Sequence, residues 1–188
     1  VVSLSGEAYF DVESDETRPF IVETATLKVK ATGTRFNVQE YLNNPVSEVM
    51  LVSGKLTINE SNPENNYQLI SELSPNQYLA YNRDTKEKQI KDEDVSRYIA
   101  WKDGKLIFRN ESLDKVLDKI SRMFNVDIVI QGEDLKKYRY HATFQDESLE
   151  EILKLLKLSA PLSFREIRRV PLPDGSFTKK RVLVYPSK

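Results

Sequence analysis

The hydrophobic periodicity of this 188-residue chain changes once, near Trp101, and this change constrains the fold more than any other feature. Before about residue 90, short runs of β-branched and aromatic residues alternate with polar ones, which is the pattern of half-buried strands. After Trp101, apolar residues recur three and four positions apart, which is the pattern of amphipathic helices. We therefore expect an all-β unit followed by a small α+β unit.

The first half of the chain predicts a series of short strands separated by turn-forming residues. Gly33 lies inside this region and indicates a turn or bulge with positive φ, because a phosphate-binding loop would need further glycines and a following helix. Many short strands at this spacing favour a β-sandwich, a roll or a short β-solenoid. The expected strands are Gly6–Val12, Phe20–Thr24, Leu27–Ala31, Thr34–Tyr41, Val46–Ser53, Lys55–Asn59, Gln68–Leu73 and Gln77–Asn82.

The second half contains an internal repeat. Residues 110–117 read Asn-Glu-Ser-Leu-Asp-Lys-Val-Leu, and residues 146–153 read Asp-Glu-Ser-Leu-Glu-Glu-Ile-Leu. Each copy predicts a strand, a helix and a strand, with Ser112 or Asn110 capping the first helix and Ser148 forming a capping box with Glu151 on the second. We expect this duplicated β-α-β unit to form a small α+β sandwich in which both helices cover one face of a sheet.

The chain is expected to end in a hairpin of two strands, 162–170 and 179–185, whose loop turns at Asp174-Gly175. Its basic residues form either an ordinary charged face or a positive patch that suits an acidic protein surface. In the preceding helix, the flank of the apolar stripe is where a surplus of exposed leucine is expected, unless the domain's own core needs all of it. The candidate partner-binding residues are Leu155, Leu158, Arg165, Arg168 and Arg169.

Charge also divides the chain. Residues 1–100 carry 10 Lys and Arg against 16 Asp and Glu, whereas residues 101–188 carry 18 against 13. We therefore expect a β domain over residues 1–90, a charged linker over 91–100 and an α+β domain over 101–188. Trp101 stands where the pattern changes, and packing between or within the domains is a better explanation for it than ligand stacking. Because the chain opens at Val1 within an apolar stretch, we expect it to be part of a longer protein.

The composition excludes several classes of function. With no cysteine, the chain can form no disulfide, no zinc–cysteine site and no thiol nucleophile. A net charge of -1 and a pI near 6.0 argue against a dedicated nucleic-acid-binding domain. No apolar run approaches the roughly 20 residues of a membrane-spanning helix.

The residues that could carry chemistry form no recognisable constellation. The single histidine, His141, is out of phase with Tyr140, Ala142 and Phe144 on its predicted strand, so it should face solvent. One exposed histidine makes neither a Ser-His-Asp triad nor a transition-metal site, and the acidic runs have no ligand spacing. We expect no enzymatic activity, no cofactor and no metal.

Several short motifs in register resemble the FecR family of anti-sigma factors. They are Gly6-Glu7-Ala8-Tyr9-Phe10-Asp11-Val12, Arg18-Pro19-Phe20-Ile21-Val22, Gly33-Thr34-Arg35-Phe36-Asn37-Val38 and Val52-Ser53-Gly54-Lys55-Leu56. Residues 100–108, Ala-Trp-Lys-Asp-Gly-Lys-Leu-Ile-Phe, and the two Ser-Leu helices resemble the C-terminal domain that accompanies FecR in Bacteroidetes. That domain is similar to STN, the short N-terminal signalling domain of TonB-dependent receptors and secretins.

This resemblance implies the periplasmic, signal-receiving region of an inner-membrane anti-sigma factor. Its partner would be the signalling domain of a TonB-dependent outer-membrane transporter, which we expect to dock on the second domain by helix-face packing or by pairing with a sheet edge. The extracytoplasmic-function sigma factor and the membrane would be contacted only through an N-terminal region and a transmembrane helix that this sequence lacks. The resemblance thus implies a regulator of transcription that transduces nutrient status.

A competing hypothesis is a carbohydrate- or envelope-binding β module with an assembly adaptor domain. Sugar rings stack on exposed aromatic side chains, so this hypothesis requires a cluster of tyrosines on one open face of the first domain. The candidates are Tyr9, Tyr41, Tyr67, Tyr78 and Tyr81.

Overall fold

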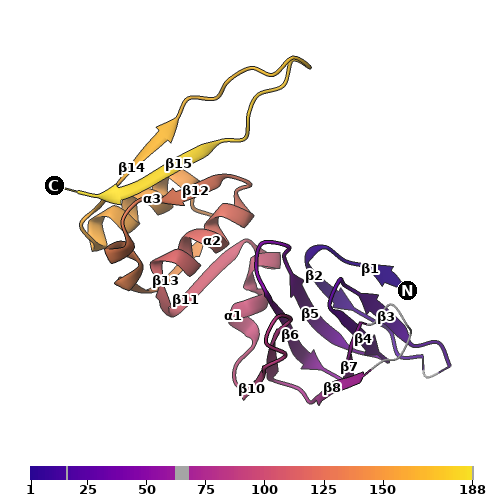
Figure 1. The fold of residues 1–188 in the computed structure, drawn as a ribbon. Coiled ribbons are helices and arrows are strands. Elements are labelled where there is room, and N and C mark those ends of the chain that lie inside the picture. The colour runs from indigo at the N-terminus through magenta and orange to yellow at the C-terminus, as the bar shows by residue number, and fades with distance from the viewer. Residues whose placement is uncertain (16, 62–67, 188) are drawn as a thin grey trace. The chain divides into compact units, whose positions relative to one another are not determined.

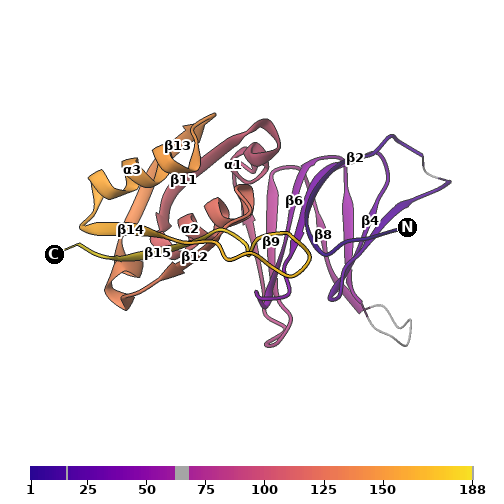
Figure 2. The ribbon, with the colours of Figure 1, turned by 90° about the horizontal axis from the view of Figure 1, so that it is seen from above.

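In the computed structural model of the chain, residues 1–15, 17–61 and 68–187 are described. The chain divides into two compact units, Val1–Ile99 and Ala100–Lys188. Their elements are labelled in Figure 1 and are seen from a second direction in Figure 2.

The first unit is a β-sandwich of two five-stranded sheets, so the β-rich fold class expected from the sequence is confirmed. All strand pairs are antiparallel except β1 with β3. The first sheet has the order β1 (Val2–Ser3), β3 (Phe20–Glu23), β4 (Leu27–Ala31), β7 (Leu56–Glu60) and β8 (Gln68–Leu73). The second has the order β10 (Lys88–Asp92), β9 (Gln77–Asn82), β6 (Val46–Ser53), β5 (Arg35–Glu40) and β2 (Gly6–Asp11).

The core of the sandwich comes from alternate residues of both sheets. Leu27, Val29 and Ile58 are fully buried on the first sheet, and Phe36 and Val38 are fully buried on the second. Alternation within β4 and β7 places one face of each strand in this core. The period-two pattern of the sequence thus translates directly into the two inner faces of the sandwich.

Two glycines of the FecR-like motifs serve close backbone packing. Gly33 has φ 66° and Gly54 has φ 92°, which confirms the positive φ expected at Gly33. A Cβ on Gly54 would lie 2.6 Å from the carbonyl oxygen of Gly33, and a Cβ on Gly33 would lie 2.8 Å from the side chain of Ser14. These motif residues are therefore explained by the fold.

The segment assigned to a linker contains regular structure. Strand β10 pairs with β9, and a one-turn helix, α1 (Ser96–Ile99), follows it. All five residues of β10 are exposed, so the strand has no buried face and no period-two apolar pattern. Its charged residues suit an edge strand, because they discourage pairing with another chain.

Within the first unit, the α1 region packs against the sandwich through aromatic residues. Val95 is buried with Met50 and Tyr78, and the rings of Tyr78 and Tyr98 stack with their centroids 4.9 Å apart. The Tyr78 hydroxyl donates a hydrogen bond to Glu48 over 2.8 Å. Burial raises the pKa of Tyr78 well above its ordinary value, and the Glu48 carboxylate adds to this effect. Tyr78 is therefore a neutral packing residue.

The second unit is the expected small α+β fold with a duplicated β-α-β unit, but its strands form two sheets instead of one. Strands β11 and β13 pair with each other, and β15 lies between β12 and β14. Figure 1 shows both helices between these two sheets, so the expectation that they cover one face of a single sheet is wrong. The elements are β11 (Lys105–Ser112), α2 (Leu113–Met123), β12 (Asp127–Ile130), β13 (Arg139–Gln145), α3 (Leu149–Ser159), β14 (Leu162–Ile167) and β15 (Arg181–Pro186), with short 3-10 helices at Ala100–Asp103 and Glu133–Lys137.

The repeat is reproduced in the backbone. Asn110 and Asp146 occupy equivalent positions and both adopt a left-handed conformation, with φ 57° and 65°. Two residues later, Ser112 and Ser148 are the N-caps of α2 and α3, with φ -69° and -68°. The duplication seen in the sequence therefore extends to the backbone geometry of both helix starts.

Candidate interaction surface on the second unit

Helix α3 buries one stripe and exposes another. Leu149, Ile152 and Leu156 lie in the core of the second unit, whereas Leu155 is 45% exposed and Leu158 is 83% exposed. A leucine exposed to this extent contributes little to the core of its own domain. The exposed flank of α3 is thus an apolar surface available to a partner.

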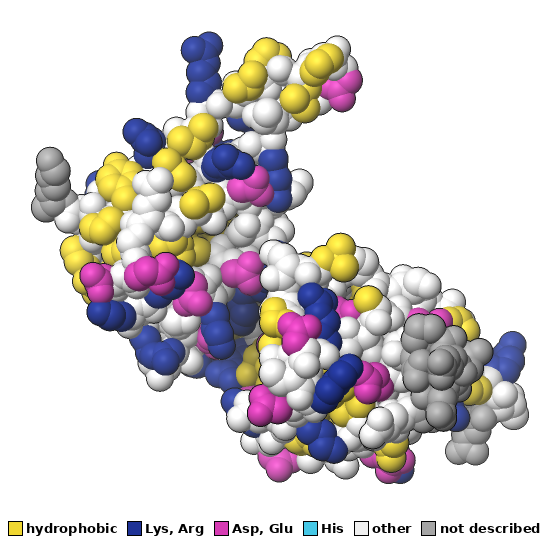
Figure 3. All heavy atoms as spheres, viewed as in Figure 1, with side chains coloured by type: hydrophobic (Ala, Val, Ile, Leu, Met, Phe, Trp, Pro, Cys, Tyr) yellow, Lys and Arg dark blue, Asp and Glu magenta, His cyan; other side chains and the backbone are white. Residues whose placement is uncertain are grey.

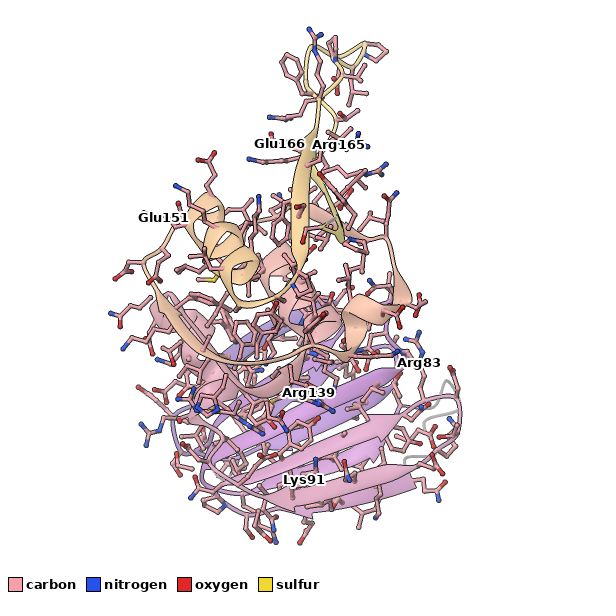
Figure 4. All side chains as sticks on the ribbon, turned by 90° about the vertical axis from the view of Figure 1, so that its left-hand side faces the viewer. Arg83, Lys91, Arg139, Glu151, Arg165 and Glu166 are labelled. Carbon is pink, nitrogen blue, oxygen red and sulfur yellow. The ribbon has the colours of Figure 1, made fainter. Side chains whose placement is uncertain are left out.

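Strand β14 carries Arg165 on the opposite face from the core. Leu162 and Phe164 pack into the core of the second unit, so alternation directs Arg165 outward. Leu183 is the cross-strand partner of Arg165 and also pairs with Val129 of β12. Figure 4 shows Arg165 beside Glu166 on β14. One row across the outer face of this sheet therefore combines a cation with two apolar side chains.

Beyond β14 and β15, the hairpin continues as an arm, which we define as residues 168–180. Figure 1 shows it extending away from the two helices of the unit. Three large apolar side chains of the arm are exposed: Val170 by 59%, Leu172 by 41% and Phe177 by 52%. Figure 3 shows hydrophobic side chains gathered on the arm close to basic ones.

The basic residues of the hairpin divide into two groups. Lys179 and Asp127 form an ion pair of 3.0 Å, and so do Lys180 and Glu166. Arg181 lies 3.9 Å from Asp127. These three cations have their charges partly balanced within the hairpin and β12.

The three arginines that the sequence singled out differ from these lysines. Among the described residues, no carboxylate forms an ion pair with Arg165, Arg168 or Arg169. Arg169 donates a hydrogen bond to the Thr178 carbonyl over 2.9 Å, and its guanidinium lies 5.4 Å from the centre of the Phe177 ring. The uncompensated positive charge of the hairpin is therefore concentrated at these arginines.

The five predicted residues occupy three places instead of one patch. Leu155 and Leu158 lie on α3, Arg165 lies on the outer face of β14, and Arg168 and Arg169 begin the arm. The sequence analysis missed the exposed apolar residues of the arm. Their signal was present, since Val170, Leu172 and Phe177 are large apolar residues close to a predicted turn, where polar residues are the norm.

Within the described residues, no group of three or more potential metal ligands occurs. His141 is exposed on β13, as its position in the strand predicted. Among the helices of the described residues, none is long and apolar enough to cross a membrane.

The described candidates for glycan stacking do not form an open cluster of tyrosines. Tyr78 is 7% exposed and Tyr81 is 4% exposed, so neither ring offers a face to a sugar. Tyr9 and Tyr41 are half-buried, and the Tyr41 hydroxyl donates a hydrogen bond to Glu7. Tyr67 lies outside the described residues. The described tyrosines therefore give the carbohydrate-binding hypothesis no support.

The fold defines a two-unit protein in which a β-sandwich precedes a small α+β unit. Residues 2–57 match the model of the FecR protein family, and residues 105–170 match the model of the FecR C-terminal region. The two matches together span more than half of the chain. The chain belongs to the FecR family of anti-sigma factors.

Solved structures agree with this assignment. Two crystal structures of a protein from Parabacteroides distasonis, described as a candidate anti-sigma factor, were determined at 1.65 Å and 2.50 Å. Both are 27% identical to this chain over 99% of its length, with TM-scores of 0.78 and 0.77. The alignments cover 80% and 79% of those chains. No curated protein matches the chain significantly.

Proposed function

We propose that this chain is the signal-receiving region of an anti-sigma factor, and that its second unit binds the signalling domain of a TonB-dependent outer-membrane transporter. The observation that carries the proposal is the combination of exposed apolar side chains and unpaired arginines on α3, β14 and the arm. Membership of the FecR family supplies the regulatory context. In this role the chain acts by binding and not by catalysis.

The location and the remaining partner follow from the family. FecR proteins are typically anti-sigma factors of the inner membrane, and we place this region on the periplasmic side, anchored there in the full-length protein. The sigma factor would then be held by a separate N-terminal segment. The duplicated β-α-β organisation of the second unit supports its interpretation as an STN-like domain. In this proposal the chain consists of a FecR-like β domain over residues 1–90, a junction over residues 91–100 and the STN-like domain over residues 101–188.

The signal requires two states of the receiver with different affinities for the transporter domain. A ligand shifts an equilibrium only by the difference in its affinity for the two states. Docking on the second unit would favour one state, and the change in stability or exposure would reach the membrane segment and the sigma factor. A nutrient-loaded transporter would in this way release or activate the sigma factor.

A calorimetric titration tests the proposal. The chain is titrated with the purified signalling domain of a transporter encoded beside it, at low and at physiological salt. We expect saturable one-to-one binding that weakens as salt rises, because exposed charges are screened over about 10 Å at 0.1 M salt. Absence of binding at both salt concentrations would contradict the proposal.

Charge reversal sharpens the same test. Replacing Arg165, Arg168 and Arg169 together by Glu should weaken binding by about tenfold or more and flatten its salt dependence, because the surface loses its complementarity to an acidic partner. The control is Lys30→Glu on β4, an exposed position on the first unit. If the triple variant binds as tightly as the wild type at both salt concentrations, the basic surface has no part in docking.

A further inference from the structure

The arm keeps the register of the β14–β15 ladder, although regular strand pairing ends at Ile167 and Arg181 and the arm itself contains a single bridge between Pro171 and Phe177. In the ladder, Ile167 pairs with Arg181, and the same register places Val170 opposite Thr178 and Leu172 opposite Ser176. The Thr178 amide donates to the Val170 carbonyl over 2.9 Å, and the Leu172 amide donates to the Ser176 carbonyl over 2.7 Å. These bonds join the two backbone segments that carry Val170, Leu172 and Phe177.

The tip of the arm is closed by a specific turn. Gly175 adopts φ 83°, and its amide donates to the Leu172 carbonyl over 3.0 Å. The Asp174 carboxylate accepts hydrogen bonds from the Ser176 hydroxyl and amide over 2.6 and 2.9 Å. A preorganised hairpin loses less conformational entropy on binding than a flexible loop of the same length.

Strand alternation defines what each face of the arm presents. On β14 the core-facing positions are Leu162 and Phe164, and the same side of the hairpin continues through the exposed Glu166 to Arg168, Val170 and Leu172. The first two side chains are covered by the core of the unit, whereas Val170 and Leu172 are largely exposed. The arm thus extends a core-facing row past the end of the core that covers it.

The opposite face of the arm is also unusual. Phe177 is 52% exposed, and the Arg169 guanidinium lies 5.4 Å from the centre of its ring. Aromatic side chains, phenylalanine included, and arginine are enriched in the buried centres of protein interfaces. An isolated two-stranded ribbon is marginally stable in water, so a ribbon that exposes three large apolar side chains gains from a partner that covers them.

Charge indicates the chemistry of that partner. Arg168 and Arg169 have no carboxylate partner among the described residues, whereas Lys179 and Lys180 do. A partner that supplies carboxylates beside an apolar surface would satisfy both features of the arm. A lipid bilayer fits less well, because hydrogen bonds from Ser176 lower the pKa of Asp174 and keep this carboxylate charged at the tip.

We infer that the arm is the primary docking element of the second unit, and that it inserts Val170, Leu172 and Phe177 into an apolar depression bordered by acidic residues on the transporter signalling domain. This inference rests on the proposed function and adds to it the element that makes the contact. In this inference, α3 and the outer face of β14 contribute less than the arm to binding of the transporter signalling domain.

The test compares three serine variants of the whole chain. Leu172→Ser and Phe177→Ser remove exposed apolar side chains of the arm, and Leu42→Ser is the matched control on the first unit, where Leu42 is 76% exposed. All three positions lie outside the cores, so the variants should keep the circular dichroism spectrum and melting temperature of the wild type. Arg168→Glu provides a fourth variant that changes charge alone.

Each variant is titrated with the purified signalling domain of the transporter. We expect Leu172→Ser and Phe177→Ser each to weaken binding by about tenfold or more, Arg168→Glu to weaken it and reduce its salt dependence, and Leu42→Ser to match the wild type. If the wild type binds and the arm variants bind equally well, the arm is not the docking element, although the proposed function stands. If the wild type itself does not bind, the proposed function fails and the inference fails with it.

Two further measurements test whether the arm binds a different partner, either a lipid membrane or a second copy of this chain. Sedimentation with phosphatidylglycerol vesicles that is lost in Phe177→Ser would overturn the inference in favour of a membrane contact. A concentration-dependent dimer of the wild type that is lost in Phe177→Ser would overturn it in favour of self-association. We expect neither vesicle binding nor a dimer that depends on Phe177.

Discussion

Glu40 connects the two sheets of the first unit. Its carboxylate accepts hydrogen bonds from the Thr24 hydroxyl over 2.6 Å, the Ser47 hydroxyl over 2.7 Å and the Thr26 amide over 3.0 Å. Thr24 and Thr26 border the β3–β4 turn in one sheet, while Glu40 and Ser47 belong to the other. Since Glu40 is only 4% exposed, these bonds replace water around a buried charge.

Removing this carboxylate should destabilise the first unit strongly. We expect Glu40→Ala to lower the free energy of unfolding by about 2–4 kcal/mol, because it leaves buried donors without an acceptor. Glu40→Gln keeps one acceptor oxygen and should cost less. Denaturant unfolding measures both, with Glu72→Ala as a control at an exposed ion pair with Lys55, where a change within about 0.5 kcal/mol is expected. Equal unfolding midpoints for Glu40→Ala and the wild type would refute this role.

Residue positions were predictable where a local pattern determines them. The exposure of His141 followed from strand alternation, and the positive φ of Gly33 followed from its surroundings. The burial of Glu40 could not be predicted, because its partners are 7 to 16 residues away in the sequence and meet it only after the strands have paired. The exposed cluster on the arm depends in the same way on how far the core extends beneath the hairpin.

The two repeated helices offer an internal comparison at the level of elements. On α3 the Ser148 hydroxyl accepts a hydrogen bond from the Glu151 amide, and the Glu151 carboxylate accepts one from the Ser148 amide over 2.8 Å. On α2 the equivalent Ser112 makes no side-chain cap bond, and Lys115 stands at the position of Glu151. The capping box predicted from the sequence is therefore confirmed on the second copy.

The two serines should respond differently to the same substitution. We expect Ser148→Ala to lower the free energy of unfolding of the second unit by about 1 kcal/mol, the usual cost of losing an N-cap. Ser112→Ala, the matched control, should cost clearly less because no cap bond is lost. Thermal or denaturant unfolding, followed by a probe in the second unit, measures both variants. Equal losses would show that the box contributes nothing specific to α3.

The pH dependence of the free energy of unfolding provides a second test of the capping box. The hydrogen bond with the Ser148 hydroxyl lowers the pKa of Glu151 below its usual value of 4.5. A carboxylate with a depressed pKa in the folded state stabilises the fold above its unfolded pKa and loses this effect as the pH falls through the folded value. The difference between wild type and Ser148→Ala should therefore shrink in acid well below pH 4.5.

Elements with one buried face were predictable, and elements without one were not. Four strands of the first unit, β4, β6, β8 and β9, begin and end as the sequence predicted. Strand β10 was missed because it is exposed on both faces, and the single turn of α1 is too short to show a helical period. The hydrophobic pattern reflects which residues are buried. It therefore cannot predict an edge strand with no buried face or a helix of a single turn.

The sequence also predicted the number and order of elements in the second unit better than their arrangement. Two β-α-β copies suggested one sheet, yet the strands divide between a pair, β11–β13, and a three-stranded sheet, β12-β15-β14. Both sheets bury residues in the same core, Phe108 and Phe144 from one and Leu162 and Val184 from the other. Periodicity cannot distinguish one sheet from two that share a core, because each strand buries one face in either case.

At the scale of the whole molecule, we expect the two units to have different tasks. The first half of the chain has a formal charge of -6 and a tightly packed sandwich, whereas residues 101–188 have a charge of +5 and carry the arm with its exposed apolar side chains. We expect the first unit to act as a stable scaffold and the second to receive the partner.

Hydrogen exchange of the whole chain, with and without the transporter signalling domain, tests this division most directly. We expect binding to slow exchange in residues 149–185, most strongly in the arm, and to change exchange little in the strands of residues 1–99. Protection confined to the first unit, or no protection at saturating partner, would contradict the assignment of the second unit as the receiver.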